Sequence, residues 1–248
     1  MNAFSLEGKR ILVTGASSGI GRATAIVASS LGAQVVLTAR RQGELEQTRA
    51  LCMGSGHLVL PGDVREASFL KALLEQGAPL DGVAHVAGVC PIEPVSLFDQ
   101  ARAMDAVNVN CLAFIEMMKT LARSKSRGTP FSAVAVSSVS AEVGWSGGTV
   151  YCAAKGALSS CVRALATELA PRGIRVNAVC PSNVKTPMFD AVAGRLGDEA
   201  SRAALLKRQP LGIGQPEQVA WPICFLLSAA ASFITGVNLP VDGGYLAQ

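Results

Sequence analysis

The stretch "RILVTGASSGIGRATAIVASSLG", residues 10–32, decides the fold. An apolar run at 10–14 has the composition of a buried strand, a glycine-rich turn at 14–21 follows it, and residues 21–32 have helical spacing. This order brings backbone N–H groups and the positive end of a helix dipole to one point, where they can bind a pyrophosphate. An ordinary tight turn is the alternative, because the spacing G-x-x-x-G-x-G differs from the G-x-G-x-x-G fingerprint. The dinucleotide contacts expected in this turn are Gly15, Ser17, Ser18, Gly19, Ile20 and Gly21.

Strand-like and helix-like segments alternate along the rest of the chain. The apolar runs lie at 10–14, 34–39, 57–61, 82–88, 131–138, 174–180 and 236–241, and helical spacing occurs at 21–32, 68–77, 114–124 and 157–173. This alternation predicts an α/β fold, a doubly wound parallel sheet of seven strands with helices on both faces and ligands at the carboxyl ends of the strands. No linker is visible, so we expect one domain over residues 1–248. The polar segment 183–214 interrupts the alternation and predicts a substrate lid, which we place at 187–212.

Composition excludes several classes of protein. The chain of 248 residues is 50% hydrophobic and carries a net charge of +4 without basic runs interleaved with aromatics, so no nucleic-acid partner is expected. Seven cysteines without a C-x-x-C pair indicate neither a disulfide framework nor a zinc site, and two histidines supply little for any metal. The N-terminus lacks a signal-peptide core and no apolar run is long enough to span a bilayer, which favours a cytoplasmic protein without a membrane partner.

Two adjacent arginines follow the second apolar run. An acidic residue there would bind the 2′-hydroxyl of NAD, whereas Arg40 and Arg41 are suited to pair with the 2′-phosphate of NADP. NADP(H) is therefore favoured over NAD(H), with Arg40 ranked ahead of Arg41. The alternative is a pair of solvated residues that open a helix, where cations are mildly unfavourable. After the third run, Asp63 and Val64 are placed to meet the adenine ring, although Asp63 could instead cap a helix.

Tyr151 and Lys155 are four residues apart at the start of a predicted helix, so their side chains point the same way, one turn apart. Lowering the pKa of a tyrosine from about 10 to about 7 requires roughly 4 kcal/mol of preferential stabilisation of the phenolate. One cation at about 4 Å in an effective dielectric of about 20 supplies about that much. Tyr151 could then exchange a proton with a substrate oxygen, and Ser138, at the end of the preceding strand, could hydrogen-bond the same oxygen. Taken alone, Y-x-x-x-K is usually structural.

The motifs taken together resemble the short-chain dehydrogenase/reductase family. The chain contains "TGASSGIG", "GDV", "AG" at 87–88, "VSS", "YCAAK", "RVNAVCPSNVKTP" and "TGVNLPVDGG", in the order and at about the spacing of the single-domain members. The resemblance covers essentially the whole chain. It implies a Rossmann fold and hydride transfer between a nicotinamide and an alcohol or carbonyl.

Site residues follow from this resemblance by position. Tyr151 resembles the proton donor or acceptor, Lys155 the residue that holds the nicotinamide ribose and lowers the tyrosine pKa, and Ser138 the residue that orients the substrate oxygen. The family's catalytic asparagine corresponds to Asn110, with Asn108 as the alternative. The remaining cofactor contacts implied by the resemblance are Ala87, Gly88, Pro181, Val184 and Thr186.

Two departures from the family pattern are visible. His85-Val86 precede Ala87-Gly88 where the family usually has two asparagines, and we interpret His85 as a structural replacement rather than a catalytic base. Ser182 stands where the family usually has glycine, next to the expected nicotinamide site. Trp145, in the loop before Tyr151, either lines the substrate pocket or fills a surface groove.

The function predicted is that of an NADP(H)-dependent alcohol dehydrogenase or carbonyl (ketone) reductase, most similar in general pattern to 3-oxoacyl-thioester reductases. The alternative is a module that senses NADP(H) without turnover, which would not need the phenol. An enoyl reductase would space its tyrosine and lysine more widely than 151 and 155. The expected partners are a small alcohol or carbonyl substrate and further copies of the chain, as a homotetramer or homodimer.

The predicted lid mixes apolar and basic residues. Such a mixture suits a moderately apolar carbonyl compound with an anionic part, but the same charges would serve a solvated helix face, and the solvated interpretation is slightly favoured. The residues concerned are Met188, Phe189, Leu196, Leu205 and Leu206 with Arg195, Arg202, Lys207 and Arg208.

Overall fold

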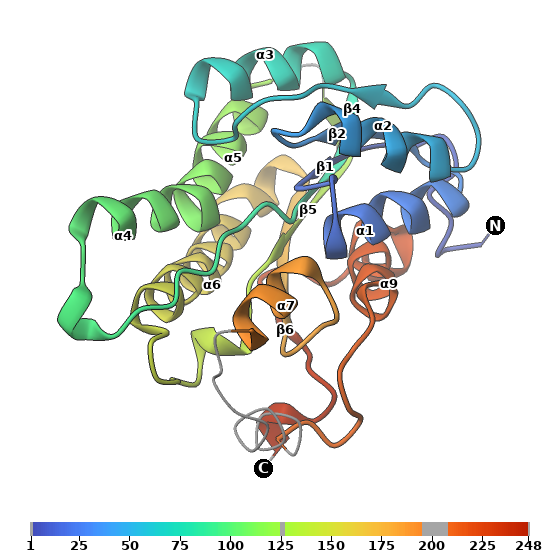
Figure 1. The fold of residues 1–248 in the computed structure, drawn as a ribbon. Helices are drawn as coiled ribbons and strands as arrows, with labels where there is room; N and C mark the ends of the chain where they lie inside the picture. Colours follow the sequence, from blue (N-terminus) through green and yellow to red (C-terminus); the bar gives the residue numbers. More distant parts are fainter. Residues whose placement is uncertain (1, 125–126, 195–207, 248) are drawn as a thin grey trace.

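The computed structural model describes residues 2–124, 127–194 and 208–247, which form a three-layer α/β arrangement (Figure 1). Its strands run parallel in one sheet with the order β3-β2-β1-β4-β5-β6-β7. The strands are β1 (Arg10–Thr14), β2 (Gln34–Thr38), β3 (Leu58–Val59), β4 (Leu80–His85), β5 (Arg127–Val136), β6 (Ile174–Pro181) and β7 (Asn238–Val241). The predicted doubly wound parallel sheet of seven strands is therefore confirmed.

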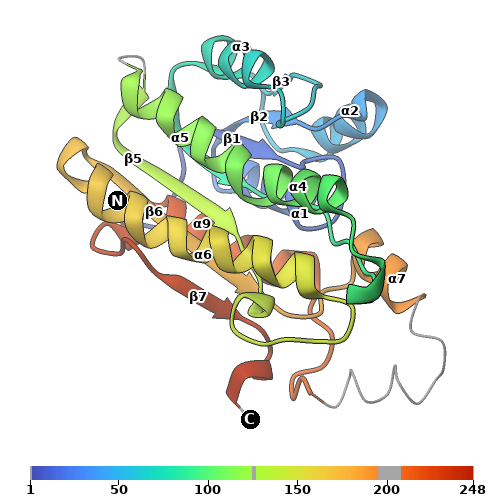
Figure 2. The same ribbon diagram turned by 90° about the vertical axis from the view of Figure 1, so that its left-hand side faces the viewer.

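Helices cover both faces of the sheet. One face carries α1 (Gly19–Ser30), α2 (Gln42–Leu51) and α9 (Pro216–Leu227), and the other carries α3 (Ala67–Gly77), α4 (Gln100–Val107), α5 (Ala113–Arg123) and α6 (Thr149–Leu169). Figure 2 shows α3, α5, α4 and α6 in front of the sheet, with α1 and α9 behind it. The strand residues alternate between the two cores: Ile11 and Val13 pack toward α1 and α9, whereas Leu12 packs toward α3 and α5.

The glycine-rich turn between β1 and α1 is closely packed. Gly15 has φ +67°, and a Cβ there would lie 2.8 Å from the backbone nitrogen of Ala87, in the loop after β4. A Cβ on Gly21 would overlap the carbonyl oxygen of Gly15. Residues without side chains are therefore required where the first turn of α1 folds back on the end of β1, and the loops after β1 and β4 meet at the carboxyl edge of the sheet.

Some element bounds differ from the sequence prediction. β3 has two residues instead of five, and β5 starts at Arg127 instead of 131 because its register with β4 shifts between Leu80 and Gly82. The helical stretch predicted at 157–173 belongs to the longer α6, which begins at Thr149 and so includes both Tyr151 and Lys155. Its continuation ends at Gly173, which has the left-handed backbone conformation (φ +69°) that terminates a helix.

The predicted lid at 187–212 is described only at its two ends. α7 (Pro187–Ala193) follows β6, and the Thr186 hydroxyl caps it by accepting a hydrogen bond from the backbone N–H of Phe189 at 3.1 Å. Residues 195–207 lie outside the described part of the chain. Among the described helices, none combines the length and the apolar character needed to cross a membrane.

Candidate active site

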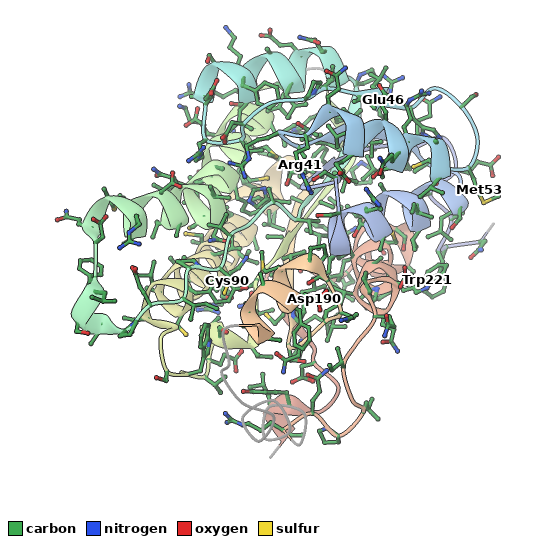
Figure 3. The ribbon with its side chains drawn as sticks, viewed as in Figure 1. Arg41, Glu46, Met53, Cys90, Asp190 and Trp221 are labelled. Carbon is green, nitrogen blue, oxygen red and sulfur yellow. The ribbon has the colours of Figure 1, made fainter. Side chains whose placement is uncertain are left out.

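A cavity of about 800 Å³ opens at the carboxyl edge of the sheet. It is bounded by the loops after β1, β2, β4, β5 and β6, by the start of α6 and by α7. Arg41, from the loop after β2, and Cys90, from the loop after β4, both line it and are labelled in Figure 3. All of the site residues predicted from the sequence line this one cavity: Gly15, Ser17, Ser18, Gly19, Ile20, Gly21, Arg40, Arg41, Asp63, Val64, Ala87, Gly88, Asn110, Ser138, Tyr151, Lys155, Pro181, Val184 and Thr186.

Tyr151 lies in the first turn of α6 and is partly exposed to the cavity. Burial raises the pKa of its phenol, the nearby Cys90 thiol adds to the rise, and a hydrogen bond with Ser138 opposes it. The net direction is the opposite of the lowering expected from the sequence, because desolvation by the whole cavity is the largest cause of the shift. A phenol with a raised pKa is protonated at neutral pH, which suits a proton donor to a carbonyl oxygen.

Lys155 is 4% exposed, and its Nζ donates a hydrogen bond of 2.8 Å to the carbonyl oxygen of Val136, the last residue of β5. The same Nζ lies 5.7 Å from the centre of the Tyr151 ring. Burial lowers the pKa of Lys155 to about 8. The ammonium is therefore largely retained at neutral pH and lost in mildly alkaline solution.

Asn110 lies in a π-helical turn, residues Asn108–Leu112, between α4 and α5. Its Nδ2 donates to the carbonyl oxygens of Val89 and Ala106, both at 2.9 Å, and its Oδ1 accepts from the backbone N–H of Val89 at 3.3 Å. A buried amide thus ties the loop after β4 to the π-helical turn. Asn108, the alternative from the sequence, is outside the set of described residues that line the cavity.

The lack of a side chain at Gly88 lets Asn110 and Lys155 come close together. A Cβ on Gly88 would lie 2.7 Å from Asn110 Oδ1 and 3.4 Å from Lys155 Nζ. Any side chain at this position would displace the amide or the ammonium, so the "AG" pair after β4 is required by space as well as by backbone geometry.

Arginines occupy the end of the cavity next to β2 and β3. Arg41 Nη2 donates to the hydroxyls of Ser17 and Ser18, at 3.2 and 3.3 Å, so it reaches the glycine-rich turn. Arg40 lies closer to Asp63, whose pKa its charge helps to lower, although Arg65 is the larger cause. Of the two predicted arginines, Arg41 therefore contacts the glycine-rich turn, and the ranking of Arg40 ahead of Arg41 for the 2′-phosphate stays a prediction.

Arg65 was missed by the sequence analysis. Its guanidinium binds both carboxylate oxygens of Asp63, with Nε at 3.0 Å from each oxygen and Nη2 at 2.6 Å from Oδ2, and it also pairs with Asp105 in α4. The sequence feature that could have pointed to Arg65 was its position two residues after "GD" at the end of the third apolar run. The alternative role of Asp63 as a helix cap is not observed, because the N-cap of α3 is Glu66.

His85 is buried and fixed in one tautomer. Thr14 Oγ1 accepts hydrogen bonds from the backbone N–H of Val86 and Ala87, so its own proton is donated to His85 Nδ1 at 3.1 Å. The ring then carries its proton on Nε2, which donates to the carbonyl oxygen of Val109 at 3.2 Å. These contacts are those of a structural replacement for an amide. Burial, reinforced by the charge of Lys155, lowers the pKa of His85 to about 4.

The residues present fit a nicotinamide dinucleotide. The N-cap residue Ser18 makes no side-chain hydrogen bond to the first turn of α1, so that end of the helix is not closed by its own cap. Glycines leave room for close approach at the turn, and the arginines lie at the opposite end from Tyr151. The described residues contain no group of three or more His, Cys, Asp or Glu side chains that could hold a metal ion.

Comparisons with known proteins agree with this architecture. A family model described as enoyl-(acyl carrier protein) reductase matches residues 15–246. L-xylulose reductase of Mus musculus is 37% identical over 248 residues, which cover 98% of this chain and 99% of that protein. The 3-oxoacyl-[acyl-carrier-protein] reductase of Pseudomonas aeruginosa is 36% identical, with 97% of this chain and 98% of that protein covered.

A solved structure from Agrobacterium tumefaciens gives a likeness at the level of the fold. It is a provisionally named 2-deoxy-D-gluconate 3-dehydrogenase with bound NADP, 32% identical, with a TM-score of 0.91 over the full length of both chains. Fold, cavity and relatives together define a nicotinamide-dependent oxidoreductase that acts on alcohols or carbonyl compounds. The chain belongs to the short-chain dehydrogenase/reductase family.

The buried, neutral His85 predicts a specific loss of stability in acid. Its pKa is about 4 in the folded protein and about 6.5 in the unfolded chain, so between these values the unfolded chain binds one more proton. Stability is therefore lost as the pH falls from about 6.5 toward 4. Urea unfolding at pH 7 and pH 5 should show that His85→Asn removes about 2 kcal/mol of the acid-dependent loss. Equal losses in the variant and the parent would contradict a neutral, buried His85.

Proposed function

We propose that this protein is an NADP(H)-dependent short-chain alcohol dehydrogenase or ketone reductase with Tyr151 as the general acid/base. The observation that carries the proposal is the meeting of Ser138, Tyr151, Lys155 and Asn110 in one cavity that also includes the glycine-rich turn. A glycine-rich turn suited to a pyrophosphate, and a phenol beside a buried ammonium in the same cavity, are what this reaction requires.

Each of the four residues has a role in the proposal. Tyr151 donates its phenolic proton to the carbonyl oxygen in reduction and accepts it in oxidation, and Ser138, hydrogen-bonded to Tyr151, holds the same oxygen. Lys155 keeps a positive charge beside the phenol and binds the nicotinamide ribose. Asn110 supports the proton path to Lys155 from the π-helical turn. The nicotinamide, when bound, supplies or accepts the hydride.

The charges at the adenosine end support NADP(H) as the cofactor. Arg40 and Arg41 both line the cavity there, and the carboxylate of Asp63 is paired with Arg65, so it does not repel a 2′-phosphate as an isolated acid would. The Agrobacterium relative was solved with NADP. We assign the 2′-phosphate to Arg40 and Arg41, the adenine to Asp63 and Val64, and the nicotinamide to a wall made of Ala87, Gly88, Pro181, Val184 and Thr186.

Assembly and location complete the proposal. Large apolar side chains are exposed near α4, where Leu97 is 63%, Phe98 55% and Met104 47% exposed, and on α9, where Trp221 is 52% exposed (Figure 3). Such surfaces favour a homodimer or homotetramer. The reduced state of the seven cysteines favours a cytoplasmic location, and we retain a single domain with a lid at 187–212.

The alternative is a protein that binds NADP(H) as a sensor without turnover. Burial of the Lys155 ammonium argues against it, because a dinucleotide can be bound without taking a charge out of water beside a phenol. An enoyl reduction, suggested by the description of the family model, is disfavoured because tyrosine and lysine are only four residues apart. Assays of turnover with ketone and enoyl substrates distinguish the ketone reductase, the sensor and the enoyl reductase.

Turnover should require the phenolic oxygen. With NADPH, the purified protein is expected to reduce a member of a panel that includes a ketosugar, a 3-oxoacyl thioester, cyclic ketones and oxo acids, and not an enoyl thioester. Tyr151→Phe should lower kcat by at least about 100-fold, because the proton donor is lost, while the affinity for NADPH changes little. NADPH binding without any turnover by the parent would favour the sensor.

Cofactor preference should depend on the arginine pair. Arg41→Asp and Arg40→Asp are each expected to lower kcat/KM for NADPH by about 10- to 100-fold and to shift the preference toward NADH, because a charge-assisted contact with the 2′-phosphate becomes a repulsion. Arg49→Asp, on the exposed side of α2 where Arg49 pairs with Glu46, is the matched control. An unchanged ratio of NADPH to NADH activity in both cavity variants would refute the assignment.

A further inference from the structure

The cavity that holds Tyr151 is partly lined by apolar side chains. Ile92, Val143, Trp145, Met188 and Phe189 line it, and they come from the loop after β4, the loop before α6 and α7. Trp145 is held in place, because its Nε1 donates to the Ser140 hydroxyl at 3.1 Å, and its ring lies 6.5 Å from that of Tyr151. Of the two roles considered for Trp145, the structure favours the pocket wall.

One further cation lines this cavity. Apart from Lys155, Arg208 is the charged side chain that the described residues bring to the cavity outside the adenosine end. Its guanidinium carbon lies 5.0 Å from the centre of the Tyr245 ring, and Tyr245 lines the same cavity. Arg208 is exposed to solvent and also lines the cavity, so it is a cavity residue as well as a solvated one.

Residues next to Arg208 and Tyr245 are hydrogen-bonded to the exit of β6. Gln209, next to Arg208, is 4% exposed; its Nε2 donates to the carbonyl oxygen of Asn183 at 3.1 Å and its Oε1 accepts from the Asn183 N–H at 3.2 Å. Ser182 Oγ donates to the carbonyl oxygen of Asp242 at 2.8 Å. The Asp242 carboxylate in turn accepts from the N–H groups of the turn that carries Tyr245, at 3.0 and 2.9 Å.

The unusual serine after β6 therefore has a structural role. Through Asp242 it anchors the C-terminal turn against the loop that leaves β6, and this places Tyr245 beside Arg208. Arg208 and Tyr245 are thus presented by two segments that are both hydrogen-bonded to the exit of β6. Little ordering of the backbone would be needed when an anion binds there.

We propose that Arg208, supported by Tyr245, forms a carboxylate subsite, and that the substrates are small, mainly apolar alcohols or ketones that carry a carboxylate. This inference rests on the proposed function. A guanidinium fork matches a carboxylate in geometry and charge. Apolar side chains in the same cavity as Tyr151 and Arg208 disfavour a polyhydroxylated substrate, because each hydroxyl left without a partner against them costs free energy. The carboxylate takes no part in bond making and acts only through binding.

The test compares two ketones that differ at one group, which is a carboxylate in the first and an uncharged amide in the second. Reduction of 4-oxocyclohexanecarboxylate and of 4-oxocyclohexanecarboxamide by NADPH is measured for the parent, for Arg208→Gln and for the control Arg49→Gln. The parent should favour the acid, and Arg208→Gln should lower the acid-to-amide ratio of kcat/KM by about 10-fold, mainly through KM. The control should keep the ratio of the parent. An equal ratio in the parent and in Arg208→Gln overturns the subsite.

A binding measurement separates this proposal from the proposed function. Calorimetric titration of cyclohexanecarboxylate into the protein saturated with NADP⁺ requires no turnover, and its affinity should fall about 10-fold in Arg208→Gln. Affinity that is independent of Arg208 overturns the subsite even if ketones are reduced. Affinity that depends on Arg208, without reduction of any ketone on the panel, supports the subsite and rejects the reductase.

Discussion

The arrangement of the candidate site depends on one buried charge, the ammonium group of Lys155. Taking this group out of water is unfavourable, and the hydrogen bond that its Nζ donates to the carbonyl oxygen of Val136 compensates only in part, because the pKa of Lys155 still falls to about 8. Its position next to Tyr151 follows from the i, i+4 geometry of α6. A group that is costly to bury is expected where chemistry requires it.

The neighbouring elements are shaped to accommodate this charge. Gly88 has no side chain because Asn110 Oδ1 and Lys155 Nζ occupy the space, and the π-helical turn that carries Asn110 is held by the His85 ring through Val109. The charge of Lys155 also contributes to the low pKa of His85, so the histidine stays neutral and its tautomer stays fixed. The candidate catalytic groups and the structural groups at the carboxyl edge are therefore coupled through charge as well as contact.

Local sequence patterns predicted many of these elements and their spacing, and contacts between distant segments explain the features that they did not predict. The strand, glycine turn and helix at 10–32 depend on adjacent residues, and Tyr151 and Lys155 depend on spacing within one helix, so both could be predicted from the sequence. Arg208 and Tyr245 meet only because Gln209 and Asp242 are both tied to the exit of β6, and no local pattern signals that contact. The direction of the Tyr151 pKa shift likewise could not be predicted, because burial is a property of the assembled cavity.

The Lys155 ammonium is buried at a cost in stability. The most direct test of this cost is the pH dependence of the free energy of unfolding in the parent and in Lys155→Met, measured by urea unfolding without added nucleotide. Between pH 8 and about 10.5 the folded parent releases the Lys155 proton while the unfolded chain keeps it, so the parent gains stability as the pH rises. The account predicts that the parent gains about 2 kcal/mol relative to the variant over this range. Parallel pH profiles for the two proteins would contradict it, because Lys155 would then behave as an ordinary solvated lysine.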